Sequence, residues 1–132
     1  MSQQTILVVD DDPDILMTTQ VALDRSGYEV ITATNGFEAV GAARVRKPDL
    51  ILLDVMLPEE NGYRVARILR EDEACGVYER PNLIVLVTAR DLSSAPDREE
   101  MFRDFAKPDR VIYKPFDLDD LMGQVAELLA NR

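Results

Sequence analysis

The chain has 132 residues, of which 46% are hydrophobic and 30% are charged, and its formal net charge is −10. This length suits one domain with one core, and the acidic balance argues against nucleic-acid binding, which depends on a basic surface. Histidine is absent and cysteine occurs once, which excludes histidine-based catalysis, histidine metal ligation and an internal disulfide.

Short apolar runs rich in β-branched residues alternate with segments of helical pattern along the whole chain. Such runs are typical of strands that are buried on both faces of a sheet. The expected strands are Thr5–Val9, Tyr28–Ala33, Leu50–Asp54, Asn82–Thr88 and Val111–Tyr113. The expected helices run from Asp12-Pro13 to Gly27, from Asn35-Gly36 to about Arg46, from Tyr63 to Glu73, from Pro96 to Phe105 and from Asp117 to Ala130.

Residue types at the ends of the first helix support these limits. Asp12 is a suitable N-cap, Pro13 fits the first helical position, and Gly27 fits the position after the helix end. The segment from Leu57 to Gly62 is expected to be a loop that leads into the third helix. Strands and helices that alternate with short connections imply a parallel sheet covered on both faces. We therefore predict an α/β fold: a doubly wound five-stranded parallel sheet with helices on both faces, built from the whole chain.

Reactive side chains stand at the carboxyl ends of four of these strands. Asp10 and Asp11 follow the first strand and Asp54 ends the third. Thr88 ends the fourth strand, and Lys114 follows the fifth. Ligands of open parallel sheets bind outside the carboxyl ends of the strands, so we expect these side chains to share one pocket.

Carboxylates gathered in one pocket need compensation, because two of them about 4 Å apart repel by about 4 kcal/mol at an effective dielectric of 20. A raised pKa on one member is one solution, and a divalent cation is the other. A hard ion such as Mg²⁺ binds carboxylate oxygens and leaves room for a phosphoryl oxygen. A carboxylate beside it can act as a nucleophile that forms an aspartyl-phosphate. Thr88 and Lys114 offer a hydroxyl and an ammonium for the phosphoryl oxygens.

These residues resemble those of a response-regulator receiver domain, the phosphorylatable module of two-component signalling. The resemblance covers essentially all 132 residues, and its motifs follow in the right order at the right strand ends. They are Val8-Val9-Asp10-Asp11, Leu53-Asp54-Val55-Met56-Leu57-Pro58 through Gly62, Thr88-Ala89 and Lys114-Pro115-Phe116. The resemblance implies a flavodoxin-like sheet with strand order 2-1-3-4-5.

The resemblance also implies a role for each site residue. Asp54 would accept a phosphoryl group from a phosphohistidine, carried by a histidine kinase or a histidine phosphotransfer protein. Thr88 and Lys114 would bind the phosphoryl oxygens, and Lys114-Pro115 is a candidate cis peptide. The implied ligands of Mg²⁺ (or Mn²⁺) are Asp10, Asp11, Asp54 and the backbone carbonyl of Met56. Such a domain catalyses only its own phosphorylation and dephosphorylation, and it is not otherwise an enzyme.

The fifth strand departs from the family pattern. The family usually has an aromatic residue three positions before the lysine, where this chain has Val111, and Tyr113 is the nearby aromatic. Both side chains lie on the same face of a strand, so Tyr113 either takes over the switch role or is a packing residue. The switch candidates are therefore Thr88, Tyr113 and Val111. The expected output surface is the fourth helix, fifth strand and fifth helix, for a downstream protein or for a phosphorylation-linked homodimer.

Other interpretations remain open. A receiver-like binding module that is never phosphorylated is one, because Val111 replaces the usual aromatic residue. A phosphatase of the haloacid-dehalogenase type is another, although its Asp-x-Asp-x-Thr/Val signature has Asp14 in the last position here. Lys107-Pro108 competes with Lys114-Pro115, but Lys107 does not end an apolar strand, so Lys114 is favoured.

The remaining expectations concern domains and location. The apolar runs are strand-sized, far below the roughly 20 residues of a membrane helix. The first residues lead almost directly into a strand, so no secretory signal is expected, and the single Cys75 fits a reducing compartment. We expect a cytoplasmic protein without membrane or nucleic-acid partners. No output domain follows the last helix, so residues 1–132 are expected to be a single receiver domain, either free-standing or excised.

Overall fold

The computed structural model describes residues 3–57, 60–89, 104 and 106–132. Its main sheet has five parallel strands in the order β2-β1-β3-β6-β7. They are β1 (Thr5–Val9), β2 (Glu29–Ala33), β3 (Leu50–Asp54), β6 (Leu83–Ala89) and β7 (Arg110–Lys114). Because β6 and β7 are the fourth and fifth strands of this sheet in chain order, the predicted order 2-1-3-4-5 is confirmed.

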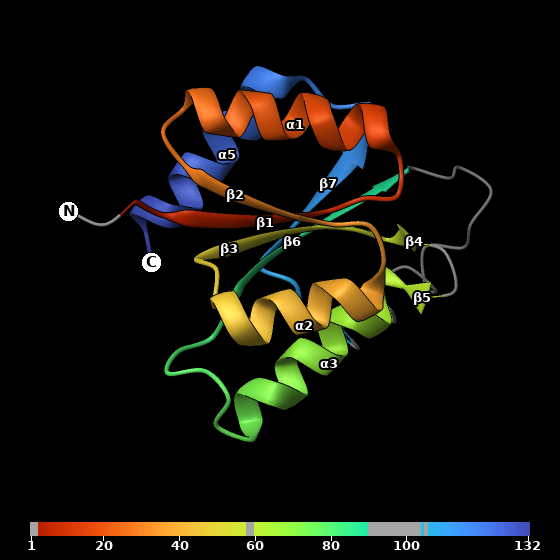
Figure 1. Cartoon of the computed structure of the whole chain (residues 1–132), viewed down its shortest axis with the longest axis vertical. Coiled ribbons are helices and arrows are strands. Elements are labelled where there is room, and N and C mark those ends of the chain that lie inside the picture. The colour runs from red at the N-terminus through yellow and green to blue at the C-terminus, as the bar shows by residue number, and fades with distance from the viewer. Residues whose placement is uncertain (1–2, 58–59, 90–103, 105) are drawn as a thin grey trace.

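Helices cover both faces of the sheet, as predicted for a doubly wound fold. The helices described in full are α1 (Pro13–Arg25), α2 (Gly36–Arg46), α3 (Gly62–Ala74) and α5 (Leu118–Ala130). In Figure 1, α1 and α5 lie on one side of the sheet and α2 and α3 on the other. The helix predicted for Pro96–Phe105 lies outside the described residues, apart from Asp104.

The local signals in the sequence act as expected at the first helix. The Asp12 side chain accepts hydrogen bonds from the backbone N–H groups of Asp14 (3.0 Å) and Ile15 (3.5 Å), which makes it the N-cap. After the helix, Gly27 adopts a φ of 94°, a conformation that favours glycine. The Lys114-Pro115 peptide is cis, as the resemblance implied.

The loop predicted between Leu57 and Gly62 is wrong in part, because this region contains a short antiparallel hairpin. Its strands are β4 (Met56–Leu57) and β5 (Glu60–Asn61). Leu57 is buried in the core cluster beneath α3, and this burial holds β4 in place. Asn61 ends the hairpin and caps α3, because its side chain accepts a hydrogen bond from Tyr63 N (2.7 Å). Strands of two residues are too short to show periodicity in a sequence.

The two faces of the sheet bury separate apolar clusters. Along β1, Ile6 and Val8 face the cluster under α1 and α5, whereas Leu7 and Val9 face the cluster under α2 and α3. All four side chains are at most 4% exposed. This alternation explains why the strand reads as one continuous apolar run. Within the described part of the chain, no helix has the length and apolar character needed to cross a membrane.

Arg70 of α3 holds the starts of β6 and β7 together. Its guanidinium donates to the backbone carbonyls of Asn82 (2.9 Å) and Lys107 (2.8 Å). It also forms ion pairs with Glu73 (2.9 Å) and Asp109 (3.0 Å). The side chains of Arg70 and Glu73 are each only 14% exposed, so water gives this network little competition. Breaking a buried pair leaves an uncompensated charge, which is costly.

Replacement of Arg70 by methionine is therefore expected to lower the free energy of unfolding by about 3 kcal/mol. Urea titration followed by circular dichroism measures the loss. Arg67→Met is the matched control on the same helix, because its pair with Glu71 is exposed (39% and 62%). That exchange should cost less than about 1 kcal/mol. Equal losses in the two variants would show that the Arg70 network does not stabilise the fold as described.

Candidate functional site

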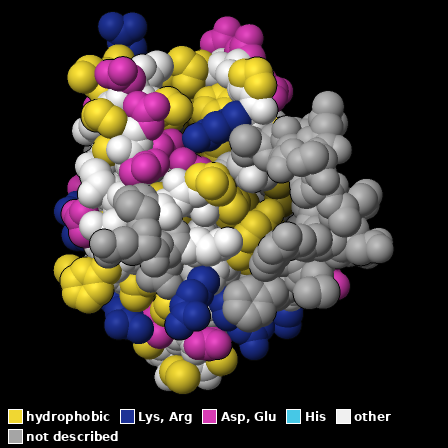
Figure 2. Space-filling model, turned by 90° about the vertical axis from the view of Figure 1, so that its right-hand side faces the viewer, with side chains coloured by type: hydrophobic (Ala, Val, Ile, Leu, Met, Phe, Trp, Pro, Cys, Tyr) yellow, Lys and Arg dark blue, Asp and Glu magenta, His cyan; other side chains and the backbone are white. Residues whose placement is uncertain are grey.

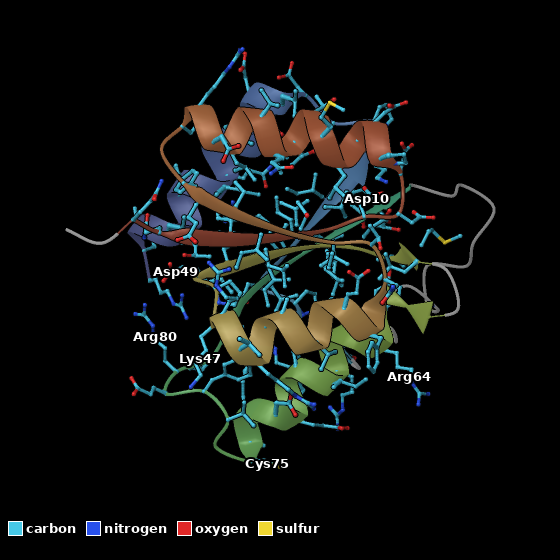
Figure 3. All side chains as sticks on the ribbon, in the orientation of Figure 1. Asp10, Lys47, Asp49, Arg64, Cys75 and Arg80 are labelled. Carbon is cyan, nitrogen blue, oxygen red and sulfur yellow. The ribbon has the colours of Figure 1, made fainter. Side chains whose placement is uncertain are left out.

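The residues predicted for the site come together at the C-terminal edge of the sheet, the end at which Figure 3 labels Asp10. Asp10 directly follows β1, Asp54 ends β3 and Lys114 ends β7. Thr88 of β6 is one residue beyond Val87, which pairs with Asp54 in the sheet. Figure 2 looks onto this end of the molecule and shows acidic side chains gathered beside hydrophobic ones.

The three aspartates form one cluster. One carboxylate oxygen from each of Asp10, Asp11 and Asp54 lies within 4.8 Å of the others. Asp10 and Asp54 are 5% and 4% exposed, whereas Asp11 is exposed. The cluster therefore has two buried carboxylates at its base and one at the surface.

Hydrogen bonds and one ammonium group hold the two buried carboxylates in place. Asp10 Oδ1 accepts from Asp12 N (2.9 Å), and Asp54 Oδ1 accepts from Met56 N (3.0 Å). The second oxygens share the Lys114 ammonium, whose Nζ lies 3.2 Å from Asp54 Oδ2 and 3.6 Å from Asp10 Oδ2. Lys114 thus supplies the positive charge that two neighbouring buried carboxylates need.

The pKa of Asp10 shows that this compensation is incomplete. Burial raises the pKa of Asp10, and the nearby Asp54 raises it further, against the opposing effects of the Asp12 N–H and of Lys114. For Lys114, burial alone lowers the pKa, but Asp54 and Asp10 outweigh burial and raise it. Lys114 therefore remains an ammonium at neutral pH, and the surroundings of Asp10 disfavour its ionised form.

The donor set fits a hard divalent cation. Three carboxylates in reach of one point, with water access from the side of Asp11, match the oxygen-rich and partly hydrated coordination that Mg²⁺ prefers. Such an ion would also supply the positive charge that Asp10 still lacks. Met56 donates its N–H to Asp54 Oδ1. The role of the Met56 carbonyl as a further metal ligand stays a prediction.

Gly62 has a steric role at the site that the sequence motif alone does not reveal. Its N–H donates to the Val55 carbonyl (2.8 Å), which brings the start of α3 against the end of β3. A Cβ atom on Gly62 would lie 2.4 Å from the Asp54 carbonyl oxygen and 2.6 Å from Val55 Cα. Since both neighbours are backbone atoms, any side chain here must displace the segment that carries Asp54.

Gly62→Ala is expected to lower the free energy of unfolding by about 3 kcal/mol, as overpacking against fixed atoms does. Gly41→Ala is the matched control, because a Cβ on this exposed glycine of α2 meets nothing within 4 Å. That exchange should stabilise the protein by roughly 0.5–1 kcal/mol through helix propensity. Thermal unfolding of both variants tests the contrast. A Gly62→Ala variant as stable as the wild type would contradict the close approach to Asp54.

The switch candidates lie on adjacent strands. Thr88 of β6 pairs with Tyr113 of β7, and Val111 pairs with Leu86. Tyr113 and Val111 are both half-buried, and Val111 packs against the core cluster under α2 and α3. Tyr113 is thus the aromatic residue beside Thr88, whereas Val111 is a packing residue further from the site. The structure does not test whether Tyr113 moves, so its switch role stays a prediction.

A groove of about 600 Å³ adjoins the site between α1 and the start of α5. Lys114 lies at one end of it, and its walls include the apolar side chains of Ile15, Phe116 and Leu118. The reactive carboxylates are therefore next to an apolar surface that a second protein could cover.

Comparison with known proteins gives a consistent picture. The family described as "Response regulator receiver domain" matches residues 6–126. PilH from Pseudomonas aeruginosa is 30% identical over 126 residues, which cover 96% of this chain and 98% of PilH. The DNA-binding dual master transcriptional regulator RpaA from Synechocystis is 36% identical over 124 residues, 94% of this chain and 48% of RpaA. The chain spans about half or less of the length of the transcriptional regulators that it matches.

Solved structures show the same fold. A CheY-like receiver domain protein from Methanospirillum hungatei has a TM-score of 0.82 at 29% identity, covering 98% of this chain and 96% of that one. The receiver domain of the sensor histidine kinase PA1611 from Pseudomonas aeruginosa has a TM-score of 0.81 at 29% identity, covering 98% and 99%. That structure holds a magnesium ion coordinated in its active-site cleft.

Proposed function

Since the chain belongs to the response regulator receiver family, we propose that Asp54 is its phosphoacceptor and that phosphorylation of Asp54 switches its contacts with other proteins. The main support for this proposal is that Asp54 contacts both the carboxylate cluster and the ammonium group of Lys114. Asp54 is a member of the carboxylate cluster, and it is also the carboxylate nearest the Lys114 ammonium, at 3.2 Å. A phosphoryl group on Asp54 would thus meet the cation-binding carboxylates on one side and a fixed ammonium on the other.

The proposed reaction is a displacement at phosphorus. A carboxylate oxygen of Asp54 forms a bond to the phosphorus of a phosphohistidine, and the P–N bond breaks with its electron pair leaving on the imidazole. Lys114 neutralises one phosphoryl oxygen and the Thr88 hydroxyl donates to another. Asp10 and Asp11, with Asp54 and the Met56 carbonyl, would hold Mg²⁺ or Mn²⁺, which neutralises charge on the transferring phosphoryl group when bound. The magnesium ion in the similar receiver of PA1611 supports this assignment.

The identity of the partners rests on the family. A histidine kinase or a histidine phosphotransfer protein is the proposed donor, and the apolar groove beside Lys114 gives it a surface to cover during transfer. The proposed output surface is the predicted fourth helix, which lies outside the described residues, together with β7 and α5. The signal would pass from Thr88 to Tyr113, its neighbour across the sheet. A phosphorylation-linked homodimer is one assembly that this surface permits. We propose a cytoplasmic location, where these partners act.

The chain is proposed to act as a signalling module and not as an enzyme with its own substrate. Residues 6–126 match the receiver family, which leaves little of the 132 residues for anything else. We therefore propose a single receiver domain over the length given. The haloacid-dehalogenase alternative is not favoured, because the comparisons identify a receiver. A module that is never phosphorylated is also disfavoured, because Asp54 and Lys114 are in contact as phosphoryl chemistry requires.

Acetyl phosphate tests the proposal without a partner protein. Incubated with acetyl phosphate and Mg²⁺, the wild-type protein should gain one phosphoryl group by intact mass, and the label should be lost in base. EDTA should prevent the gain. Asp54→Asn is the variant that decides the assignment, since it keeps the shape of the side chain but lacks the nucleophilic carboxylate. Equal labelling of the wild type and Asp54→Asn would refute the assignment of the phosphoacceptor.

A further inference from the structure

A polar cavity of about 270 Å³ lies at the opposite end of the sheet from Asp54. The turn after α2, the segment before β6 and the end of the chain form its walls. Its principal lining residues are Lys47, Asp49, Tyr78, Glu79, Arg80 and Arg132. Figure 3 shows Lys47, Asp49 and Arg80 together at the end of the molecule that is remote from Asp10.

Among the side chains that line this cavity, cations outnumber carboxylates, although the chain as a whole is acidic. Three cationic side chains line it, against the two carboxylates of Asp49 and Glu79. The local balance is therefore one positive charge, in a chain whose net charge is −10. A concave site lined mainly by one sign of charge concentrates ions of the opposite sign.

The central carboxylate does not satisfy the two guanidinium groups beside it. Asp49 Oδ2 is engaged by the backbone N–H of Thr5 (2.7 Å). Asp49 Oδ1 lies 3.6 Å from Arg80 and 3.8 Å from Arg132, both beyond hydrogen-bond distance. The Asp49 carboxylate thus pairs with both guanidinium groups at ion-pair distance only, without a hydrogen bond to either.

Arg132 is fixed in this position by the backbone. Its guanidinium donates to the carbonyls of Asp49 (2.5 Å) and Pro81 (2.7 Å), and its side chain is only 14% exposed. Burial lowers the pKa of Arg132, and the charge of Arg80 lowers it further, which shows that the two cations repel each other. An anion between them would remove that repulsion.

We propose that this cavity binds a phosphate group, either free or as the monoester of a small molecule. Three cations match the several acceptor oxygens of a phosphate better than the two of a carboxylate. Guanidinium groups recognise phosphate through paired N–H donors, and Lys47 adds a point charge. The cavity is slightly smaller than the roughly 300–1,000 Å³ of sites for drug-sized ligands, which favours a small ligand. The site is separate from the phosphoacceptor, and the proposal does not depend on the proposed function.

Amide NMR shifts of the whole chain, titrated with inorganic phosphate in EDTA at constant ionic strength, test the site. Saturable shifts are expected at Lys47, Asp49 and Arg80, and the double variant Lys47→Gln, Arg80→Gln should weaken binding at least tenfold. Arg67→Gln is the control, because Arg67 lies on α3 and does not line the cavity, and this variant should bind phosphate as the wild type does. A parallel titration with adenosine monophosphate identifies the source: tighter binding than inorganic phosphate indicates an ester. Shifts that do not saturate, or equal affinity in the double variant and the control, would overturn the proposal.

Discussion

Lys114→Met is expected to lower the free energy of unfolding at pH 7 by about 3 kcal/mol, because it leaves two buried carboxylates without their cation. Asp10 and Asp54 are 5% and 4% exposed, and Lys114 Nζ is within 3.6 Å of both. Without the ammonium, the charge of Asp54 raises the pKa of Asp10 further in the folded state. Stability is then retained below the ordinary carboxyl pKa and lost as the pH rises through the raised pKa of Asp10. Urea titrations at pH 7 and pH 4 should therefore show a much smaller loss at pH 4.

The control for this prediction is Lys107→Met. Lys107 is also followed by proline, but its side chain is exposed. The free energy of unfolding of Lys107→Met should be lower than that of the wild type by less than about 0.5 kcal/mol at both pH values. Mg²⁺ should stabilise Lys114→Met more than the wild type, because the ion binds the carboxylates that the lysine has left. A loss in Lys114→Met that does not change with pH would contradict the electrostatic account and indicate lost packing instead.

Asp10→Asn is expected to change stability and metal affinity in opposite directions. The pKa of Asp10 is raised in the folded state, chiefly by burial. The stability that protonated Asp10 contributes is therefore fully present below the ordinary carboxyl pKa. It is lost as the pH rises through the raised pKa of Asp10 in the folded protein. At pH 7 the ionised Asp10 lowers stability, so the amide should raise the free energy of unfolding by on the order of 1 kcal/mol in EDTA. The gain should vanish near pH 3.

The same exchange should weaken Mg²⁺ binding at least about tenfold, because one carboxylate of the cluster is lost. Calorimetric titration with Mg²⁺ measures the affinity, and denaturant titration in EDTA measures the stability. Asp11→Asn is the matched control, since Asp11 belongs to the same cluster but is exposed. It should weaken Mg²⁺ binding without the gain in stability. If Asp10→Asn is less stable than the wild type at pH 7, Asp10 is not the strained carboxylate described here.

The sequence predicted the sheet well because its signals are local. The run from Ile6 to Val9 is buried on both faces, so it is apolar throughout and is recognisable without any partner strand. Asp12 and Gly27 mark the limits of α1 through bonds and angles within a few residues. The site followed from the same logic, since Asp10, Asp54 and Lys114 directly follow or end apolar runs.

Features that depend on distant segments could not be predicted in this way. Arg70 contacts the backbone of Lys107, 37 positions away, and no local pattern indicates that the side chain of this arginine is only 14% exposed. Gly62 is part of the recognised motif, but the clash of a side chain with the Asp54 backbone is visible only in three dimensions. The cavity near Arg80 likewise joins three parts of the chain, and the hairpin β4–β5 has strands of two residues each.

The fifth strand was predicted only in part from the sequence. The sequence showed that Val111 replaces the usual aromatic residue and left Tyr113 with two interpretations. The structure places Tyr113 opposite Thr88 and Val111 in the packed part of the strand. Movement of Tyr113 on phosphorylation remains a prediction, which NMR shifts of its ring with and without beryllofluoride would test.

Identification of the modified residue tests the central claim most directly. The protein is phosphorylated with acetyl phosphate and Mg²⁺, the acyl phosphate is reduced with borohydride, and the digested peptides are sequenced by mass spectrometry. Reduction converts a phosphorylated aspartate to homoserine, and we predict homoserine at position 54 alone. Homoserine at Asp10 or Asp11, or at no aspartate of the cluster, would contradict the assignment of Asp54 as the phosphoacceptor.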